Sequence, residues 1–321
     1  MLMALMRRLM LSFLILFMVA VFVFAATEVL PGDALDVYLS SDDLAIMSEA
    51  DIEEMRQRFG LDRPAWVRFW EWFSGAIFGD LGKTLIDEND IVDLIWHPLL
   101  NSIILGAIIT AITLPTAFLI GSITGYNRGS RTDAAVSTLT IVGYSIPDFV
   151  IGNVLIILFA VWLALFPAVI FVFSNASTSE LLAVSLLPAL TVIIGHVAHQ
   201  SRLLRAGFIE TMNSEFVERA RLSGLSERRV VFRHALPASV IPMLNSLALY
   251  VAGLLAGLVV VERVFGYPGL GRELIEAVAR REVHVVQGIT FWSASFIILM
   301  NLLADLAIIA LDPRVRSAKS A

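Results

Sequence analysis

Residues 99–121 read LLNSIILGAIITAITLPTAFLIG and contain no charged side chain over 23 positions. A transmembrane helix needs roughly 20 consecutive, predominantly apolar residues, so this stretch is long enough to cross a bilayer as one helix. Five further stretches of the chain meet the same criterion. The sequence therefore predicts six transmembrane helices, at residues 9–27, 99–121, 134–163, 181–199, 243–261 and 288–311.

The composition of the whole chain also indicates a membrane protein. Of its 321 residues, 58% are hydrophobic and 16% are charged, and the mean hydropathy is +0.81. Soluble domains usually carry about 25% charged residues. Because a chain of this length cannot bury so much apolar surface in a core, lipid must cover the rest. The chain has no cysteine, which excludes disulfides, thiolate metal sites and cysteine nucleophiles.

Two of the predicted helices have unusual features. The first follows Arg7 and Arg8, as in a secretory signal peptide, but its apolar run of about 19 residues is longer than a signal core of about 7–15. Residues 24–27 (FAAT) also make a poor cleavage site, so we expect this helix to be retained. The third helix is longer than one span requires, and Pro147 predicts a kink or an interfacial turn within it.

The distribution of basic residues predicts the orientation of the chain. Lysine and arginine favour the cytoplasmic ends of membrane helices. With six spans, the four regions rich in basic residues fall on one side, which predicts that both termini are cytoplasmic. These residues are Arg7, Arg8, Arg128, Arg131, Arg202, Arg205, Arg219, Arg221, Arg228, Arg229, Arg233, Arg314, Arg316 and Lys319.

Residues 28–98 are then external, and they are strongly acidic. They contain 16 acidic and five basic residues, a net charge of −11. Residues 49–56 read as a solvated amphipathic helical turn, and a group of aromatic residues follows. Aromatic side chains at this density favour a membrane interface, so we expect a helix lying at the outer surface, with contact to substrate as the alternative. The aromatic residues are Trp66, Phe69, Trp70, Trp72 and Phe73.

The longest cytoplasmic segment, residues 200–241, predicts two short helices. Ser214 and Ser226 are suited to cap their starts. Gly224 is suited to end the first helix in the left-handed conformation, and Pro237 to end the second.

The first of these two helices carries two distinct faces. Glu215 and Arg219 are four apart and can pair on one face, while Phe216 lies beside Ala220 and Ser223 on another. Such a helix can insert into a groove on a partner protein, or rest on lipid headgroups through the arginines of the loop. The residues alone leave both alternatives open.

This segment resembles the cytoplasmic coupling loop of binding-protein-dependent ABC importer permeases, whose motif is Glu-Ala-Ala, three residues, Gly, nine residues, Ile-x-Leu-Pro. Arg219 replaces the first Ala, as in the dipeptide/oligopeptide/nickel branch of the family. His234 stands where Ile is usual, which is a departure from the motif. The matching positions are Glu218, Ala220, Gly224, Leu236 and Pro237.

Further stretches resemble the same branch, in the same order along nearly the whole chain. The chain is therefore identified as a member of this family, of the first-permease type with a long external segment after the first helix. The stretches are 30–33 (LPGD), 59–64 (FGLDRP), 79–82 (GDLG), 145–149 (SIPDF), 187–191 (LPALT), 260–271 (VVERVFGYPGLG) and 312–314 (DPR).

The resemblance implies an all-α polytopic membrane protein with the type I ABC importer permease fold, located in the cell inner membrane. Residues 1–98 would form the first transmembrane helix and the acidic external segment. Residues 99–321 would form a permease core of five helices with the coupling loop at 200–241. The residues implied to couple to an ATPase are Glu215, Phe216, Glu218, Arg219, Ala220, Arg221, Gly224, Leu225, Leu236 and Pro237.

The resemblance also implies partners and a substrate class. The chain would pair with a second, homologous permease, two ATPase subunits and an external solute-binding protein. It would bind no cofactor itself, because ATP and Mg would be bound by the ATPases. Short peptides are the first expectation for the substrate, with nickel complexes, glutathione-like molecules and glycosides as alternatives.

Polar residues within the predicted spans are candidates for function, because ionisable groups in a membrane are expensive. Asp148 and Asp305 are expected to lie on the pathway or to bond neighbouring helices. His196 and His199 are three apart, and polar packing is the expectation, with the pathway or a metal site as the alternatives. Gly253-x-x-x-Gly257 and Gly121-x-x-x-Gly125 permit close packing of helices.

Other classes of protein explain less of the sequence. A proton-coupled secondary transporter could use Asp148, His196 and Asp305, but it would not require the coupling motif. An intramembrane hydrolase needs a nucleophile elbow, and residues 143–147 (GYSIP) lack its closing glycine. A phosphate-binding loop ending at Lys83 and Thr84 would need glycine where Ile77 stands.

Overall fold

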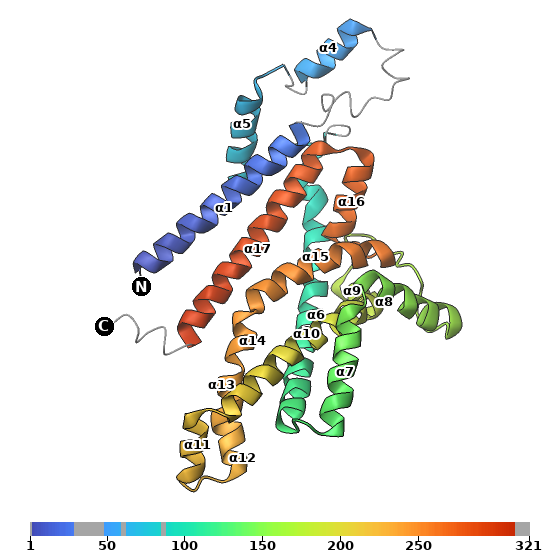
Figure 1. The fold of residues 1–321 in the computed structure, drawn as a ribbon. Helices are drawn as coiled ribbons and strands as arrows, with labels where there is room; N and C mark the ends of the chain where they lie inside the picture. Colours follow the sequence, from blue (N-terminus) through green and yellow to red (C-terminus); the bar gives the residue numbers. More distant parts are fainter. Residues whose placement is uncertain (1, 29–47, 59–61, 85–87, 312–321) are drawn as a thin grey trace. The chain divides into compact units, whose positions relative to one another are not determined.

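The computed structural model describes residues 2–28, 48–58, 62–84 and 88–311. In these ranges the regular structure is helical (Figure 1), apart from one isolated bridge between Lys83 and Asp90, so the predicted all-α fold is confirmed. The chain divides into two compact units. The first unit consists of Met1–Asn101 and Pro268–Leu302, and the second of Ser102–Tyr267 and Leu303–Ala321.

The described residues contain up to six candidate membrane spans, which agrees with the prediction. Three are single helices: Met6–Thr27 in α1 (Leu2–Glu28), α6 (Ile91–Tyr126), and Val283–Leu303 in α17 (Val283–Leu311). Three more are bent pairs: α7 (Arg131–Ser145) with α8 (Asp148–Leu155) and the π-helix η1 (Ile156–Trp162), α9 (Thr178–Val184) with α10 (Leu186–Met212), and Glu227–Leu244 with Leu249–Phe265 in α15 (Leu247–Phe265).

The break at Pro147 is a sharp turn rather than a mild kink. The two helices on either side of it meet at 100°. Ile146 takes extended backbone angles (φ −90°, ψ 125°), because a proline disfavours the α conformation of the residue before it. The third predicted span is therefore broken, and α8 starts at Asp148 in a new direction.

The first unit is held together by aromatic side chains. Phe69 and Phe73 on α5 (Ala65–Ile77) are buried and stack in parallel, with ring centroids 5.6 Å apart. Phe17 and Phe24 of α1 meet them edge to face, at 5.3 Å to Phe73 and 5.4 Å to Phe69. The predicted helix in the aromatic stretch is thus confirmed, and its inner face packs on α1.

Three more features belong to the first unit. The predicted amphipathic turn is present as α4 (Glu49–Arg58). The helix α16 (Leu270–Arg280), between α15 and α17, was not predicted from the sequence. Gln287 of α17 donates a hydrogen bond of 2.6 Å to Thr27 of α1, which ties the last described helix to the first. The predicted division of the chain at residue 98 remains a prediction.

The second unit has a continuous apolar core between α6, α10 and α15. It includes the fully buried residues Ile109, Val192 and Val261. A buried carboxylate, Glu262, accepts a hydrogen bond of 2.5 Å from Ser102 on α6. This contact gives a charged group in an apolar core the hydrogen-bond partner that it needs.

Glycines bring α6 close to α10 in the second unit. A Cβ atom at Gly121 would lie 2.6 Å from the carbonyl oxygen of Ser201, and one at Gly125 would lie 2.9 Å from Cδ1 of Phe208. Only glycine fits at such short distances. The predicted packing role of this glycine pair is therefore confirmed.

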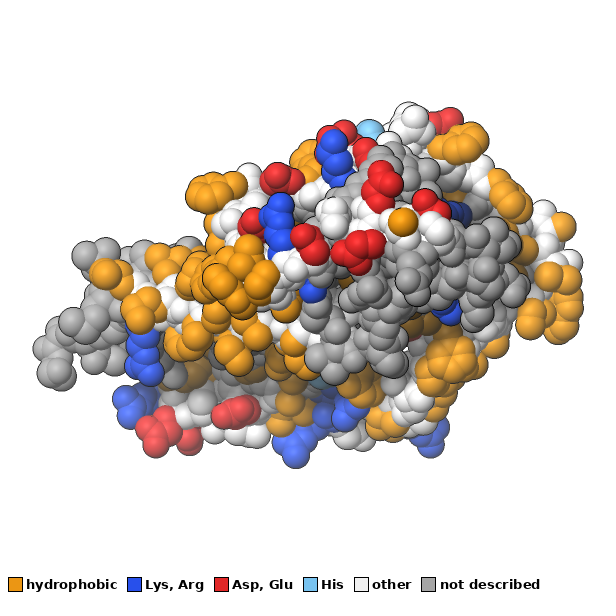
Figure 2. Space-filling view, turned by 90° about the horizontal axis from the view of Figure 1, so that it is seen from above, with side chains coloured by type: hydrophobic (Ala, Val, Ile, Leu, Met, Phe, Trp, Pro, Cys, Tyr) orange, Lys and Arg blue, Asp and Glu red, His pale blue; other side chains and the backbone are white. Residues whose placement is uncertain are grey.

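The outer surfaces of the membrane helices are apolar. Figure 2 shows several groups of hydrophobic side chains on one face of the molecule, with charged side chains in smaller groups. On α1, Met10 is 73% exposed and Phe22 is 74% exposed. Such surfaces are typical of helices in contact with lipid.

Candidate functional site

The long loop after α10 forms a compact helical projection. It comprises α11 (Glu215–Leu222), α12 (Glu227–Val230), the π-helix η2 (Val231–Ala235) and α13 (Leu236–Ser239), as Figure 1 shows. We call this segment, residues 213–239, the α11–α13 loop. The two predicted short helices are present, and the second is longer and less regular than predicted.

The α11–α13 loop has a small apolar core of its own. Val217 on α11 is fully buried and packs with Val230, Val231 and Leu236, and Phe208 at the end of α10 joins the same cluster. Ala220 packs on this cluster and is half-buried. The sequence analysis missed Val217. Its signal was the spacing of three to Ala220, which places both side chains on one helix face.

The ends of α11 agree with the prediction in position but not in every contact. Ser214 and Ser226 occupy the N-cap positions with extended backbone, yet neither side chain caps its helix. The Ser214 hydroxyl instead donates to the carbonyl of Thr211. Gly224 follows α11 with a φ of +78°, the left-handed conformation predicted for it.

The expectation that Pro237 ends the second helix is wrong. The chain stays helical through α13, because Pro237 lies in the first turn of that helix, where no backbone donor is needed. The π-helical turn of η2 precedes it and relieves the steric conflict between a proline ring and the preceding turn. Leu236 beside it is buried in the loop core, while Pro237 is exposed.

The outer face of the loop combines charged pairs with exposed apolar side chains. Arg219 pairs with Glu215 at 3.2 Å, as predicted from their spacing, and Arg221 pairs with Glu227 at 2.8 Å. The hydrogen bonds that Arg221 donates to the Glu227 carboxylate raise the pKa of the Arg221 guanidinium. Large exposed apolar side chains lie on the same loop: Phe216 at 41%, Phe232 at 70% and Leu222 at 81%.

The structure thus divides the predicted coupling residues into an outer and an inner group. The inner group, in or against the loop core, consists of Ala220, Leu225 and Leu236. The outer group is exposed and consists of Glu215, Phe216, Glu218, Arg219, Arg221, Gly224 and Pro237. Such an arrangement gives a stiff support beneath an accessible surface.

Of the candidate pathway residues, the structure brings Asp148 and Gly257 together. The carboxylate of Asp148, at the start of α8, lies between α10 and α15: its Oδ1 is 3.4 Å from where a Cβ of Gly195 would be, and its Oδ2 is 3.1 Å from that of Gly257. Gly253 has open space around its Cβ position. Asp305 lies on α17, and its side chain falls outside the described residues.

The two histidines of α10 each pack against a tyrosine. His196 meets Tyr250 of α15 edge to face, with ring centroids 5.1 Å apart. His199 stacks on Tyr144 of α7 at 5.4 Å. These contacts favour the packing interpretation over a metal site, because each ring is occupied by an aromatic neighbour.

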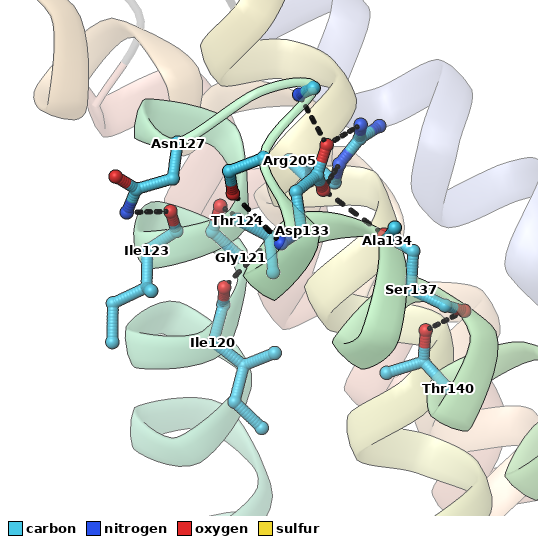
Figure 3. Close-up of polar contacts among 12 residues, drawn as sticks. Ile120, Gly121, Ile123, Thr124, Asn127, Asp133, Ala134, Ser137, Thr140 and Arg205 are labelled. Carbon is cyan, nitrogen blue, oxygen red and sulfur yellow. Dashed lines mark hydrogen bonds and ion pairs between the residues drawn. The ribbon is translucent and has the colours of Figure 1, made fainter.

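A buried ion pair fixes α7 to α10 near the base of the loop, and the sequence analysis did not find it. Arg205 donates to both oxygens of Asp133, at 2.7 and 2.8 Å (Figure 3). The same carboxylate accepts hydrogen bonds from the Gly129 backbone and from Ser137. Asp133 is only 6% exposed, so this bidentate contact is a rigid joint.

Comparison with known proteins places this architecture in a family. The family of binding-protein-dependent transport system inner membrane components matches residues 117–317, and its N-terminal component matches residues 1–87. A candidate peptide permease of Brucella ovis is 31% identical over 97% of this chain and 98% of its own length. The oligopeptide transport system permease protein AppB of Bacillus subtilis is 27% identical over 96% and 98%. The chain therefore belongs to the family of binding-protein-dependent transport system inner membrane components.

Proposed function

We propose that this chain forms, with a second homologous permease, the membrane pathway of an ATP-driven importer for short peptides. The family and the apolar helices make it a permease subunit of the inner membrane, which is not itself an enzyme. The names of the relatives, which include an oligopeptide permease, favour short peptides as substrate.

The observation that carries the proposal is the self-supporting α11–α13 loop. Its core residues hold α11 in place, while Phe216, Leu222 and the Glu215–Arg219 pair remain exposed. We assign this exposed face to a groove on an ATPase subunit. Two such ATPases and an external solute-binding protein complete the proposed complex.

Phe208 offers a route by which movement of the loop could reach the membrane helices. It is 1% exposed and belongs to the loop core, and its ring also lies against Gly125 of α6. A displacement of the loop would therefore press directly on α6. In this proposal ATP-driven closure of the ATPases shifts the loop, and Phe208 transmits the shift to the pathway helices.

The proposal is tested by isolating the complex and measuring its transport. A tagged chain is purified from native membranes in detergent, and the proteins that accompany it are identified by mass spectrometry. We expect a second permease, ATPase subunits and, after reconstitution with the binding protein, ATP-dependent peptide uptake. Uptake driven by a proton gradient in the absence of ATP would instead support the secondary-transporter alternative and contradict the proposal.

Substitutions in the loop test the coupling role separately. Gly224→Val forces a β-branched residue into the left-handed conformation, although no neighbouring atom would clash with it. Ala220→Leu pushes on the loop core. We expect both complexes to assemble in the membrane while ATP hydrolysis no longer drives uptake. Normal uptake by both variants would remove the α11–α13 loop from the mechanism.

A further inference from the structure

A partly open groove lies between α7 and α10, with a volume of about 580 Å³. Its lining residues repeat at spacings of three and four on each helix, so each wall is one helix face. The groove is therefore built by two packed helices rather than by a surface loop. Its α7 wall includes Ser137, Ile141 and Tyr144, and its α10 wall includes His199, Arg202 and Ala206.

One cation in this groove has no carboxylate partner within the described ranges. Arg205 also lines the groove, but its guanidinium already donates two short hydrogen bonds to the Asp133 carboxylate. Arg202, one turn away on the same face of α10, is exposed and forms no ion pair with the residues that the structure describes. The groove thus offers a positive charge that an anion can neutralise.

The rest of the groove is apolar and aromatic. Ile141 is 50% exposed and Tyr144 is 53% exposed, although both lie on a predicted membrane span. His199 stacks on Tyr144 and extends this flat wall. A small inorganic anion would make no favourable contact with this apolar wall. A phospholipid would, because an apolar acyl chain lies next to its phosphate.

The position of the groove along the helices also favours a lipid. The distribution of basic residues predicts that the start of α7 and the end of α10 face the cytoplasm. Anionic lipids are abundant in the cytoplasmic leaflet, and basic pockets between membrane helices on that side bind their headgroups. The positive charge, the apolar wall and the position of the groove therefore all favour an anionic phospholipid as the ligand.

We propose that this groove binds the phosphodiester headgroup of an anionic phospholipid. Arg202 contacts the phosphate, the Asp133–Arg205 pair holds the two helices at the required spacing, and Ile141 and Tyr144 contact the start of an acyl chain. The site lies on helices of the permease itself and does not depend on which solute is transported.

Lipid titration of the purified importer complex tests this site. Dioleoyl phosphatidylglycerol is added to the detergent-solubilised complex, bound lipid is counted by native mass spectrometry, and dioleoyl phosphatidylcholine serves as the uncharged reference. Arg202→Gln removes the cation, and Ala206→Phe fills the groove without changing its charge. Arg128→Gln, at the exposed turn between α6 and α7 and outside the groove, is the matched control.

We expect the wild type to prefer phosphatidylglycerol. Arg202→Gln should lower this affinity by about tenfold, the effect of one charge-assisted hydrogen bond. Ala206→Phe should also lower it, because its ring occupies the space of the lipid. Arg128→Gln should bind as the wild type does. Equal affinity in Arg202→Gln and the wild type would overturn the proposal, and this variant keeps the test valid if Ala206→Phe misfolds. Displacement of the lipid by inorganic phosphate at similar concentration would overturn the lipid assignment.

A protein occupant is distinguished by crosslinking. The chain has no cysteine, so Ala206→Cys introduces a single thiol in the groove. We expect a thiol-reactive lipid analogue to label this residue in the intact complex, and excess phosphatidylglycerol to prevent the labelling. A disulfide or crosslink from this thiol to another subunit would contradict the lipid site.

Discussion

The crossing of α6 and α10 and the α11–α13 loop are adjacent along α10, yet they are stabilised in opposite ways. At the crossing, Gly121 and Gly125 bring the helices so close that even a methyl group would clash. In the loop, side chains such as Val217 and Val231 build a small core like that of a soluble domain. The difference teaches that close approach of the backbones fixes the helix crossing, whereas a core of apolar side chains fixes the loop. Phe208 belongs to both.

The largest loss of stability is expected from a substitution of Phe208, the residue that contacts both the glycine crossing and the loop core. Phe208→Ala leaves a cavity in the loop core and beside Gly125, and it should lower the free energy of unfolding by about 3–5 kcal/mol. It should also abolish ATP-driven uptake at temperatures where the complex is still folded. Thermal unfolding of the detergent-solubilised complex and uptake by proteoliposomes measure the two effects. Phe78→Ala, which removes a ring that is 90% exposed and lies outside the α11–α13 loop, is the control and should leave the unfolding temperature unchanged.

The second largest loss of stability is expected at the crossing of α6 and α10. Gly121→Ala places a Cβ 2.6 Å from the Ser201 carbonyl, so the helices must separate, at a cost of about 3 kcal/mol. Gly253→Ala is the matched control, because nothing lies within 4 Å of its Cβ position and alanine is the better helix former. Thermal unfolding should separate the two variants clearly. Equal stability would show that α6 and α10 are not closely packed in the membrane.

A smaller loss is expected from the joint between α7 and α10. Asp133→Asn breaks the pair with Arg205, and because Arg205 keeps some access to solvent, we expect a loss of about 2 kcal/mol rather than the full cost of an unpaired buried charge. Glu71→Gln breaks an exposed pair with Arg63, outside the α11–α13 loop, and should leave the unfolding temperature unchanged. A similar loss in both variants would mean that burial does not distinguish the two pairs.

The smallest effect tests the contact between Asp148 and α15. Gly257→Ala places a Cβ 3.1 Å from the carboxylate, a cost of about 1 kcal/mol. Adding Asp148→Ala removes the opposing group, so the double variant should lose less stability than the sum of the two single variants. Strict additivity in this double-mutant cycle would show that the two residues do not touch.

The parts of the fold that depend on local sequence could be predicted. Long apolar runs predicted the spans because polar and charged side chains are costly in lipid. Gly224 predicted the left-handed end of α11 because few other residues adopt that conformation. Pro147 predicted a break, but the angle of 100° between the two helices does not follow from the proline alone. The start of α6 at Ile91 lies eight residues before the predicted start, because its first turns pack in the core of the first unit.

The remaining features depend on residues that are distant in sequence. Asp133 and Arg205 are 72 positions apart. Neither residue stands out from the other charged residues near the ends of its own helix, so nothing in the sequence indicated that the two form a pair. Val217 was overlooked because one valine in a charged helix is a weak signal until the partners that bury it are known. Pro237 was misread because the π-helical turn that accommodates it has no clear sequence pattern.

The central claim is that the outer face of the α11–α13 loop docks on an ATPase subunit. A single cysteine placed at Leu222, which is 81% exposed on α11, can be crosslinked in native membranes without interference from other thiols of this chain. A cysteine at Trp66, which is 69% exposed on α5, is the control. We expect the Leu222→Cys variant alone to form an adduct with an ATPase subunit. Adducts of equal yield from both positions, or none from Leu222→Cys in an intact complex, would contradict the account.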